Sequence, residues 1–206
     1  MRLIKQNKMI PFYKAHGTGN DTIIFFKEEC PDIISEPKFI EKICKRRTGI
    51  GADCVIIISK DKKYDFKMDY YNSDGTWETF CANGARCVAK LLYNKNIVRK
   101  KMNFIAGDGP HTAIIKNDLI LLKMKPPAII SEMITIDKYK GYLIDSGAKH
   151  FVVEVKDFNY KNVETVGRRI RHSKYFKPNG VNVNFYEKKD NNNIYVWTYE
   201  KGVEKL

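Results

Sequence analysis

Short apolar runs, some alternating and some continuous, predict most of the regular elements of this chain. Such runs, bounded by Gly, Pro, Asn and Asp, are typical of β-strands. In the first half they are residues 10–14, 22–26, 54–59, 64–71, 101–106, 111–116 and 119–123. In the second half they are residues 140–145, 151–155, 182–186 and 194–199. Many strands with few helices predict an α+β fold with mixed sheets.

Three further segments, residues 36–46, 85–93 and 162–170, have the apolar spacing of helices. Ser35 precedes the first of them and Pro37 lies in its first turn, so we expect Ser35 to be its N-cap. Each half of the chain then has strands before and after one helix. Pro126-Pro127 reads as a rigid connector between the halves. We therefore expect two similar lobes of mixed β-sheet around a helix, residues 1–125 and 126–206.

Composition and charge change this picture little. The net charge of +13 could indicate nucleic acid as a partner, but Lys is scattered and no nucleic-acid-binding motif accompanies it. We expect no membrane partner either, because no run of eighteen apolar residues and no secretory h-region occur. The five cysteines are odd in number and sparse, which is typical of a reducing compartment. We therefore expect a cytoplasmic protein.

The strongest chemical signal is the segment NSDGTWETFCANGAR at residues 72–86, which holds Cys81. Cys81 directly precedes Ala82-Asn83-Gly84 and the helical run 85–93. At a helix start, unpaired N–H groups and the helix dipole lower the pKa of a thiol and can also hold a carboxylate. The segment thus suits proton abstraction from an amino acid. The alternative is a buried structural cysteine, but the surrounding Asn, Asp and Gly favour the functional interpretation.

Six motifs in order resemble the diaminopimelate epimerase family. They are HGTGND at residues 16–21, RRTGIGAD at 46–53, YYNSDGTWETFCANGARCVA at 70–89, DSGAKH at 145–150, NGVNVNF at 179–185 and YEKGVE at 199–204. One such motif would be weak evidence, whereas six in the family's order run from about residue 10 to the end of the chain. The resemblance implies a pair of similar α/β lobes with the active site in the cleft between them.

The resemblance also implies a function, the interconversion of LL- and meso-2,6-diaminopimelate in lysine and peptidoglycan-precursor biosynthesis. The family uses no pyridoxal phosphate and no metal, so no cofactor is expected. One cysteine thiolate removes the α-proton and a second thiol returns a proton from the opposite face, which requires acid–base groups of matched pKa. The implied partners are the small-molecule substrate diaminopimelate and a second copy of the chain, because family members are often dimers.

Carried over by motif, Cys81 is the catalytic cysteine of the first lobe. The substrate-binding residues implied by the resemblance are Asn20, Asn72, Ala82, Asn83, Asn182, Glu200 and Lys201. For the asparagines the alternative is turn chemistry, because Asn caps turns and accepts left-handed backbone. We expect Cys87 in the core and no role for Cys30 or Cys44. His16 and His150 are expected to orient loops, and the sequence suggests no partner for either.

The sequence also departs from the family pattern. The second catalytic cysteine of the family follows the segment at residues 200–202, whereas all five cysteines here lie within the first 87 residues and the chain stops at Leu206. We therefore expect an incomplete second lobe. Two alternatives stay open: a catalytically inactive remnant or binding protein of the same fold, and a proline-racemase-like isomerase. Smaller departures are Cys54 for Gly or Gln, Ala82 for Gly, Ala148-Lys149 for Asn-Pro or Ser-Pro, and Lys201 for Arg.

Overall fold

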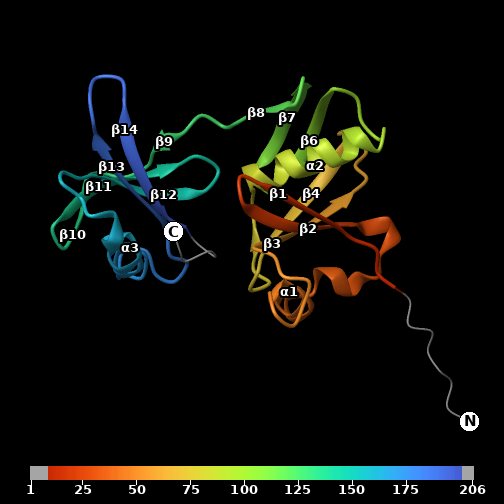
Figure 1. Cartoon of the computed structure of the whole chain (residues 1–206), viewed down its shortest axis with the longest axis horizontal. Helices are drawn as coiled ribbons and strands as arrows, with labels where there is room; N and C mark the ends of the chain where they lie inside the picture. Colours follow the sequence, from red (N-terminus) through yellow and green to blue (C-terminus); the bar gives the residue numbers. More distant parts are fainter. Residues whose placement is uncertain (1–8, 201–206) are drawn as a thin grey trace, which may run out of the picture. The chain divides into compact units, whose positions relative to one another are not determined.

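The computed structural model of the chain describes residues 9–200. The chain divides into two compact units, Met1–Lys123 and Met124–Leu206. Each unit contains one mixed β-sheet and at least one helix, coloured from red to green in the first unit and from green to blue in the second (Figure 1). The boundary lies just before Pro126-Pro127.

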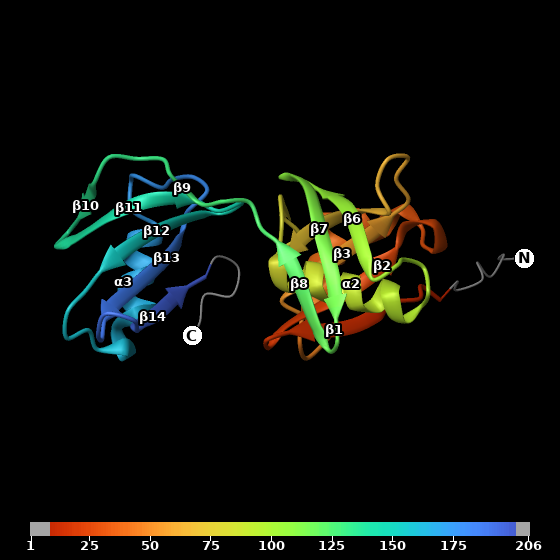
Figure 2. The same ribbon diagram turned by 90° about the horizontal axis from the view of Figure 1, so that it is seen from above.

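The sheet of the first unit has the order β1-β2-β3-β4-β6-β7-β8, with β5 paired to β4. The pairs β2–β3 and β4–β6 are parallel and the others are antiparallel. Figure 2 shows β6, β7 and β8 side by side at one edge. The strands are β1 (Tyr13–Gly17), β2 (Asn20–Phe26), β3 (Cys54–Ser59), β4 (Phe66–Asn72), β5 (Trp77–Glu78), β6 (Lys101–Ala106), β7 (Gly109–Lys116) and β8 (Leu119–Lys123).

Two α-helices cover opposite faces of this sheet, α1 (Pro37–Cys44) and α2 (Ala82–Asn94). Side chains of a strand alternate between faces, so Ile56 and Ile58 of β3 pack in the cluster that contains α2. Val55 and Ile57 pack in the cluster that contains α1. Figure 1 shows the two helices on either side of β2 and β3. Two short 3-10 helices, η1 (Lys27–Glu29) and η2 (Asp32–Ser35), lead into α1.

The sheet of the second unit has the order β10-β11-β12-β13-β14, with β9 paired to β11. Only β12–β13 is parallel among these pairs of the described residues. Helix α3 packs on the face that carries Phe151, Val153, Val183 and Phe185. The elements are β9 (Ala128–Ile129), β10 (Ile134–Ile136), β11 (Tyr139–Asp145), β12 (Lys149–Glu154), η3 (Tyr160–Asn162), α3 (Val163–Arg171), β13 (Asn182–Lys188) and β14 (Ile194–Tyr199).

The expected α+β class with a mixed sheet in each half is confirmed. The expectation for Ser35 is wrong, because Ser35 ends η2 and its hydroxyl donates to the Asp32 carbonyl at 2.8 Å. Glu36 is the N-cap of α1 and makes no side-chain cap hydrogen bond. The helix expected from residue 85 begins three residues earlier, at Ala82. The first strand begins at Tyr13 rather than at residue 10.

Candidate active site

Cys81 is the N-cap of α2 and has extended backbone, with φ −136° and ψ 110°. The Gly84 N–H donates to Cys81 Sγ at 3.4 Å. The first intrahelical bond runs from the Ala85 N–H to the Cys81 carbonyl at 2.8 Å, so the N–H groups of Ala82 and Asn83 precede it. The half-buried sulfur therefore lies at the positive end of the helix dipole, which favours a thiolate.

Asn20 begins β2 and lies beside this sulfur, because Cys81 Sγ donates to Asn20 Oδ1 at 3.9 Å. The β1–β2 turn is tight, with positive φ at Thr18 and Gly19. Its tip is held against α2, since Thr18 Oγ1 donates to Asn83 Oδ1 at 3.1 Å. The turn thus brings Asn20 to Cys81, although 61 residues of chain separate them.

Gly17 and Arg86 complete this contact between the turn and α2. A Cβ added at Gly17 would lie 2.9 Å from the Asn83 carbonyl oxygen, so only glycine permits the close approach. Arg86 Nη2 donates to Asn83 Oδ1. Asn83 Oδ1 thus accepts from both Thr18 and Arg86, and the backbone N–H of Asn83, at the start of α2, is a group that can face a ligand.

Asn72 ends β4 and is only 4% exposed. Its Oδ1 accepts from the Tyr70 hydroxyl at 2.8 Å, and its Nδ2 donates to Thr76 Oγ1 at 3.2 Å. Its backbone N–H also donates to the Thr76 carbonyl at 2.9 Å. In this structure Asn72 therefore shapes the turn at residues 72–76, as the turn-chemistry alternative foresaw, and a substrate contact remains a prediction.

Sequence reasoning gave no role to Cys54, which the structure places against Cys81. Cys54 is the first residue of β3, is 0% exposed, and pairs with Thr22 on one side and Asn72 on the other. Its interaction with Cys81 and its burial both raise the pKa of the Cys54 thiol well above its ordinary value. The sequence did contain a signal for this position. Cys54 and Ile56 are two residues apart in one strand, so their side chains lie on the same face of the sheet.

Cys44 and Cys87 lie in the two apolar clusters of the first unit. Cys87 belongs to the core cluster around α2, as expected, and burial raises the pKa of its thiol. Burial raises the pKa of Cys44 to about 11. Burial raises the pKa of the Cys30 thiol as well, so Cys81, at a helix N-terminus, is the candidate thiolate of the first unit.

A charged cluster fixes the start of β2 next to Asn20. Arg46 Nη2 lies 2.8 Å from Asp21 Oδ1 and 2.6 Å from Asp53 Oδ1, and Lys14 Nζ lies 2.9 Å from Asp21 Oδ2. Burial alone would raise the pKa of Asp21, but hydrogen bonds from Arg46, Lys14 and Asp53 hold it well below its usual range. This cluster explains why RRTGIGAD matters structurally: it ties residues 46–53 to the β1–β2 turn.

In the second unit, Asn182 and Glu200 lie at the same end of one strand pair. Asn182 begins β13, and Glu200 follows the last residue of β14. In the antiparallel register Val183 faces Tyr199, so the next pair outward is Asn182 and Glu200. Lys201 lies outside the described residues.

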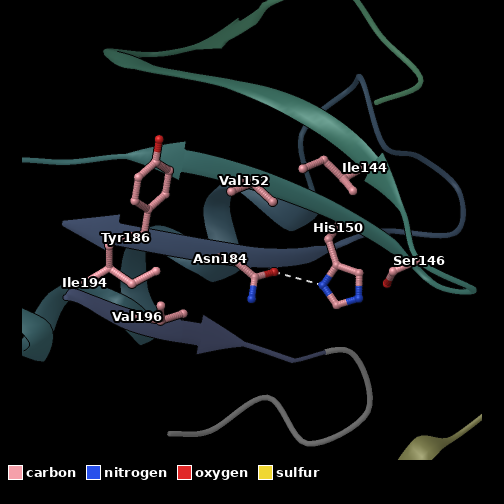
Figure 3. Close-up of a pocket in the computed structure, with 8 residues that line it drawn as sticks. All are labelled: Ile144, Ser146, His150, Val152, Asn184, Tyr186, Ile194 and Val196. Atoms are coloured by element: carbon pink, nitrogen blue, oxygen red, sulfur yellow. Dashed lines mark hydrogen bonds between the residues drawn. The ribbon is translucent and has the colours of Figure 1, made fainter. Parts of the chain in front are cut away.

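A groove of about 370 Å³ lies on the face of the second sheet opposite α3 (Figure 3). His150 Nδ1 and Asn184 Oδ1 are 2.8 Å apart in it, and Asn184 Nδ2 donates to Thr198 Oγ1 at 2.8 Å. The expectation that His150 has no partner is therefore wrong, because the parallel register of β12 and β13 brings Asn184 within reach. The lining residues are Ile144, Ser146, His150, Val152, Asn184, Tyr186, Ile194 and Val196.

Residues 9–200 contain no group of three or more His, Cys, Asp and Glu that could hold a metal ion. Among the helices of this described part, none is long and apolar enough to cross a membrane.

A profile described as diaminopimelate epimerase matches residues 12–129. The diaminopimelate epimerase of Flavobacterium psychrophilum is 38% identical over 193 residues, which cover 93% of this chain and 73% of that protein. The enzyme of the same name from Aquifex aeolicus is 35% identical, over 94% of this chain and 74% of its own length. The chain belongs to the diaminopimelate epimerase family. The family predicted from the motifs is confirmed, and so is the enzyme class, because epimerases are isomerases.

Solved structures support the fold of this diaminopimelate epimerase family member. A probable proline racemase from Agrobacterium radiobacter superposes with a TM-score of 0.67 and 16% identity, over 91% of this chain and 69% of that one. A hydroxyproline epimerase from Agrobacterium vitis superposes with a TM-score of 0.65 and 15% identity, over the same shares. At such identities the likeness concerns the fold alone.

Proposed function

We propose that this chain epimerises LL-2,6-diaminopimelate to meso-diaminopimelate without a cofactor, with Cys81 as one of two acid/base thiols. The observation that carries the proposal is the position of Cys81 Sγ, 3.4 Å from the Gly84 nitrogen at the start of α2 and beside Asn20. Membership of the diaminopimelate epimerase family supports the choice of substrate. The reaction serves lysine and peptidoglycan-precursor biosynthesis, which we place in the cytoplasm.

In the proposed reaction the Cys81 thiolate takes the α-proton, and the electron pair of the broken C–H bond stays on the α-carbon. The adjacent carboxylate accepts part of this charge. The N–H groups of Ala82 and Asn83 bind that carboxylate, because they precede the first intrahelical bond of α2. Inversion requires a second thiol that returns a proton to the opposite face of the carbon. The family pattern places that thiol after residues 200–202, whereas the five cysteines of this chain lie within the first 87 residues, so Cys81 accounts for the first proton transfer.

The remaining residues of the proposed site act by binding. Asn20 contacts the substrate beside Cys81, and Asn72 contributes from the end of β4. In the second unit, Asn182, Glu200 and Lys201 bind the substrate's polar groups, with Asn182 and Glu200 at one end of the β13–β14 pair. A homodimer is the proposed assembly.

The test is solvent exchange of the α-proton in heavy water, followed by mass spectrometry on LL- and meso-diaminopimelate separately. We expect deuterium incorporation with the wild-type chain and its loss in Cys81→Ala, because the first proton transfer needs only the thiolate. Cys30→Ala, which also removes one thiol, serves as the matched control and keeps the exchange.

Each other outcome has a defined meaning. Exchange that survives in Cys81→Ala overturns the role of Cys81. Absence of exchange in the folded wild-type chain, with binding of diaminopimelate retained, favours the non-catalytic alternative. Exchange into proline in place of diaminopimelate favours a proline-racemase-like isomerase, which the fold likeness to a probable proline racemase makes worth including.

A further inference from the structure

The sheet beneath the N-terminus of α2 ends in a row of three buried polar side chains. Thr22, Cys54 and Asn72 pair across β2, β3 and β4, and none is more than 4% exposed. One step further along the same face, Ile24 and Ile56 belong to the apolar core that packs on α2. The row therefore marks the point where the core gives way to the polar surroundings of Cys81.

The hydrogen bonds of Thr22 and Asn72 run away from Cys81, whereas Cys54 contacts it. The Thr22 hydroxyl donates to the Ile23 carbonyl at 3.3 Å and also interacts with the Cys54 thiol, whose pKa it lowers, while the Asn72 side chain bonds to Tyr70 and Thr76. The Cys54 thiol donates to the Asp21 carbonyl at 3.7 Å, and its interaction with Cys81 raises its pKa. Cys54 is thus the member of the row that meets the sulfur of the base.

The environments of the two sulfurs decide which of them donates. Cys54 is 0% exposed, and a charge buried away from water is costly. Cys81 is half-buried at a helix N-terminus, where negative charge is favourable. Cys81 therefore ionises first, and Cys54 keeps the proton that it can share. A thiol has a single S–H donor, which can turn from the Asp21 carbonyl toward Cys81 Sγ once that sulfur is charged.

We propose that Cys54 is a positioning residue for the reaction: its thiol donates a hydrogen bond to the Cys81 thiolate and keeps that thiolate populated near neutral pH. The inference rests on the proposed function only in taking Cys81 as the base. Hydrogen bonds to a charged acceptor are stronger than those to a neutral one, so the contact favours ionised over protonated Cys81.

The other ionisable groups around the pair are few, and they define the controls. Asp53 directly precedes Cys54. Asp21, whose carbonyl accepts from the Cys54 thiol, has its carboxylate bound to Arg46 and Lys14. On α2, Arg86 binds Asn83, and the Cys87 thiol interacts electrostatically with Cys81. Cys87 is therefore the matched control, because it is a second buried thiol of the first unit whose pKa the charge of Cys81 raises.

The experiment measures the rate of Cys81 alkylation by iodoacetamide against pH, with peptide mapping by mass spectrometry. This experiment needs no substrate, so its result is independent of the exchange assay. The alkylation midpoint can stay unchanged while the chain still exchanges diaminopimelate, and it can shift while no exchange occurs. We expect Cys54→Ala to raise the midpoint of Cys81 alkylation by roughly one pH unit, which slows the reaction at neutral pH about tenfold. Cys87→Ala leaves the midpoint unchanged.

A conservative variant separates hydrogen bonding from packing. Cys54→Ser keeps a donor, and we expect its midpoint to lie closer to that of the wild type than the midpoint of Cys54→Ala. Circular dichroism checks that each variant is folded, and if Cys54→Ala does not fold, Cys54→Val, which also lacks a donor and leaves a smaller cavity, takes its place. An unchanged midpoint in the folded variant that lacks a donor, or an equal shift in Cys87→Ala, overturns the proposal.

In the exchange assay the same variants give a second readout. We expect Cys54→Ala to lower kcat for α-proton exchange at neutral pH without raising KM, and the loss to diminish as the pH rises and Cys81 ionises unaided. A merely structural role for Cys54 would lower the exchange equally at every pH, and that result also overturns the proposal.

Discussion

The two sheets of this protein differ in what covers them. In the first unit β2, β3 and β4 carry α1 on one face and α2 on the other. In the second unit β12, β13 and β14 carry α3 on one face, and within residues 124–200 the opposite face is a groove with exposed apolar side chains. Ile194 is 57% exposed there and Val196 is 53% exposed.

The difference in the helices that cover the two sheets explains why the candidate base lies in the first unit. Both sheets have a parallel strand pair with an asparagine at the start of one strand, Asn20 on β2 and Asn182 on β13. Only the first sheet, among the described residues, has a helix whose N-terminus reaches that end and carries a thiol. The sheet supplies a polar end, and the N-terminus of α2 supplies Cys81, the proposed base.

The largest expected contrast is between the covered face and the open face. We expect Ile56→Ala, which removes a fully buried side chain under α2, to cost about 3–4 kcal/mol of unfolding free energy. Val196→Ala on the open face should change it by less than about 0.5 kcal/mol. Urea unfolding followed by circular dichroism measures both, with Trp197 fluorescence in a Trp77→Phe background as the reporter on the second unit. A similar cost for the two variants would show that the open face is covered in solution.

A smaller contrast concerns the glycines at the two helix–sheet contacts. A Cβ at Gly167 of α3 would lie 2.4 Å from Tyr199 Cβ and 2.6 Å from Tyr199 Cγ. These two atoms can move only if the whole tyrosine ring or the strand moves with them. A Cβ at Gly84 of α2 would meet Ile56 Cδ1 at 2.3 Å, the free end of a flexible side chain. We expect Gly167→Ala to cost about 2–3 kcal/mol and Gly84→Ala about 1 kcal/mol. Urea unfolding ranks them, and the reverse order would contradict this account of the two contacts.

Local pattern predicted the sheets well, because strand signals are confined to a few residues. Strands β3, β6, β8 and β14 begin and end at the expected residues. The misses have local causes as well. Ser35 bonds to Asp32 instead of capping α1, and strands β5, β9 and β10 have only two or three residues, too few to show alternation.

For the candidate site, the sequence predicted the position of Cys81 at a helix start but not its neighbours. The contact with Asn20 depends on a turn that packs on α2, and the contact with Cys54 depends on which face of β3 meets that helix. Likewise, the bond between His150 and Asn184 follows from a parallel register. Such contacts arise from tertiary structure, and spacing along the chain does not reveal them.

The next expected effect is the acid sensitivity of the first unit. Asp21 has a lowered pKa, so its ion pairs stabilise the fold above the ordinary Asp pKa, and this contribution is lost as the pH falls through the lowered value. Arg46 is 59% exposed, which weakens its pairs through solvent screening. We therefore expect Arg46→Ala to cost only about 1 kcal/mol at neutral pH. The cost should shrink as the pH falls below about 4, the ordinary Asp pKa.

Urea midpoints of wild type and Arg46→Ala from pH 7 to pH 3 measure this effect. Arg47→Ala, at the neighbouring exposed arginine of the same motif, is the control and should be nearly neutral. A cost for Arg46→Ala that stays constant with pH would mean that packing of its side chain, and not the charge of Asp21, is responsible. In the second unit Trp197 fluorescence should not respond to either variant.

The variants with the smallest expected effect on stability test the open face of the second sheet most directly. Ile194 belongs to the groove, where apolar side chains are contiguous, whereas Ile97 follows α2 as a single apolar residue that is 52% exposed. Ile194→Lys and Ile97→Lys should each change the unfolding free energy by less than about 0.5 kcal/mol.

Contiguous apolar surface binds hydrophobic dyes and scattered residues do not. Ile194→Lys should therefore lower the fluorescence of bound anilinonaphthalene sulfonate, and Ile97→Lys should not. Equal signals from the two variants would mean that the groove is closed to ligands and that the difference between the two sheets is smaller than their surfaces indicate.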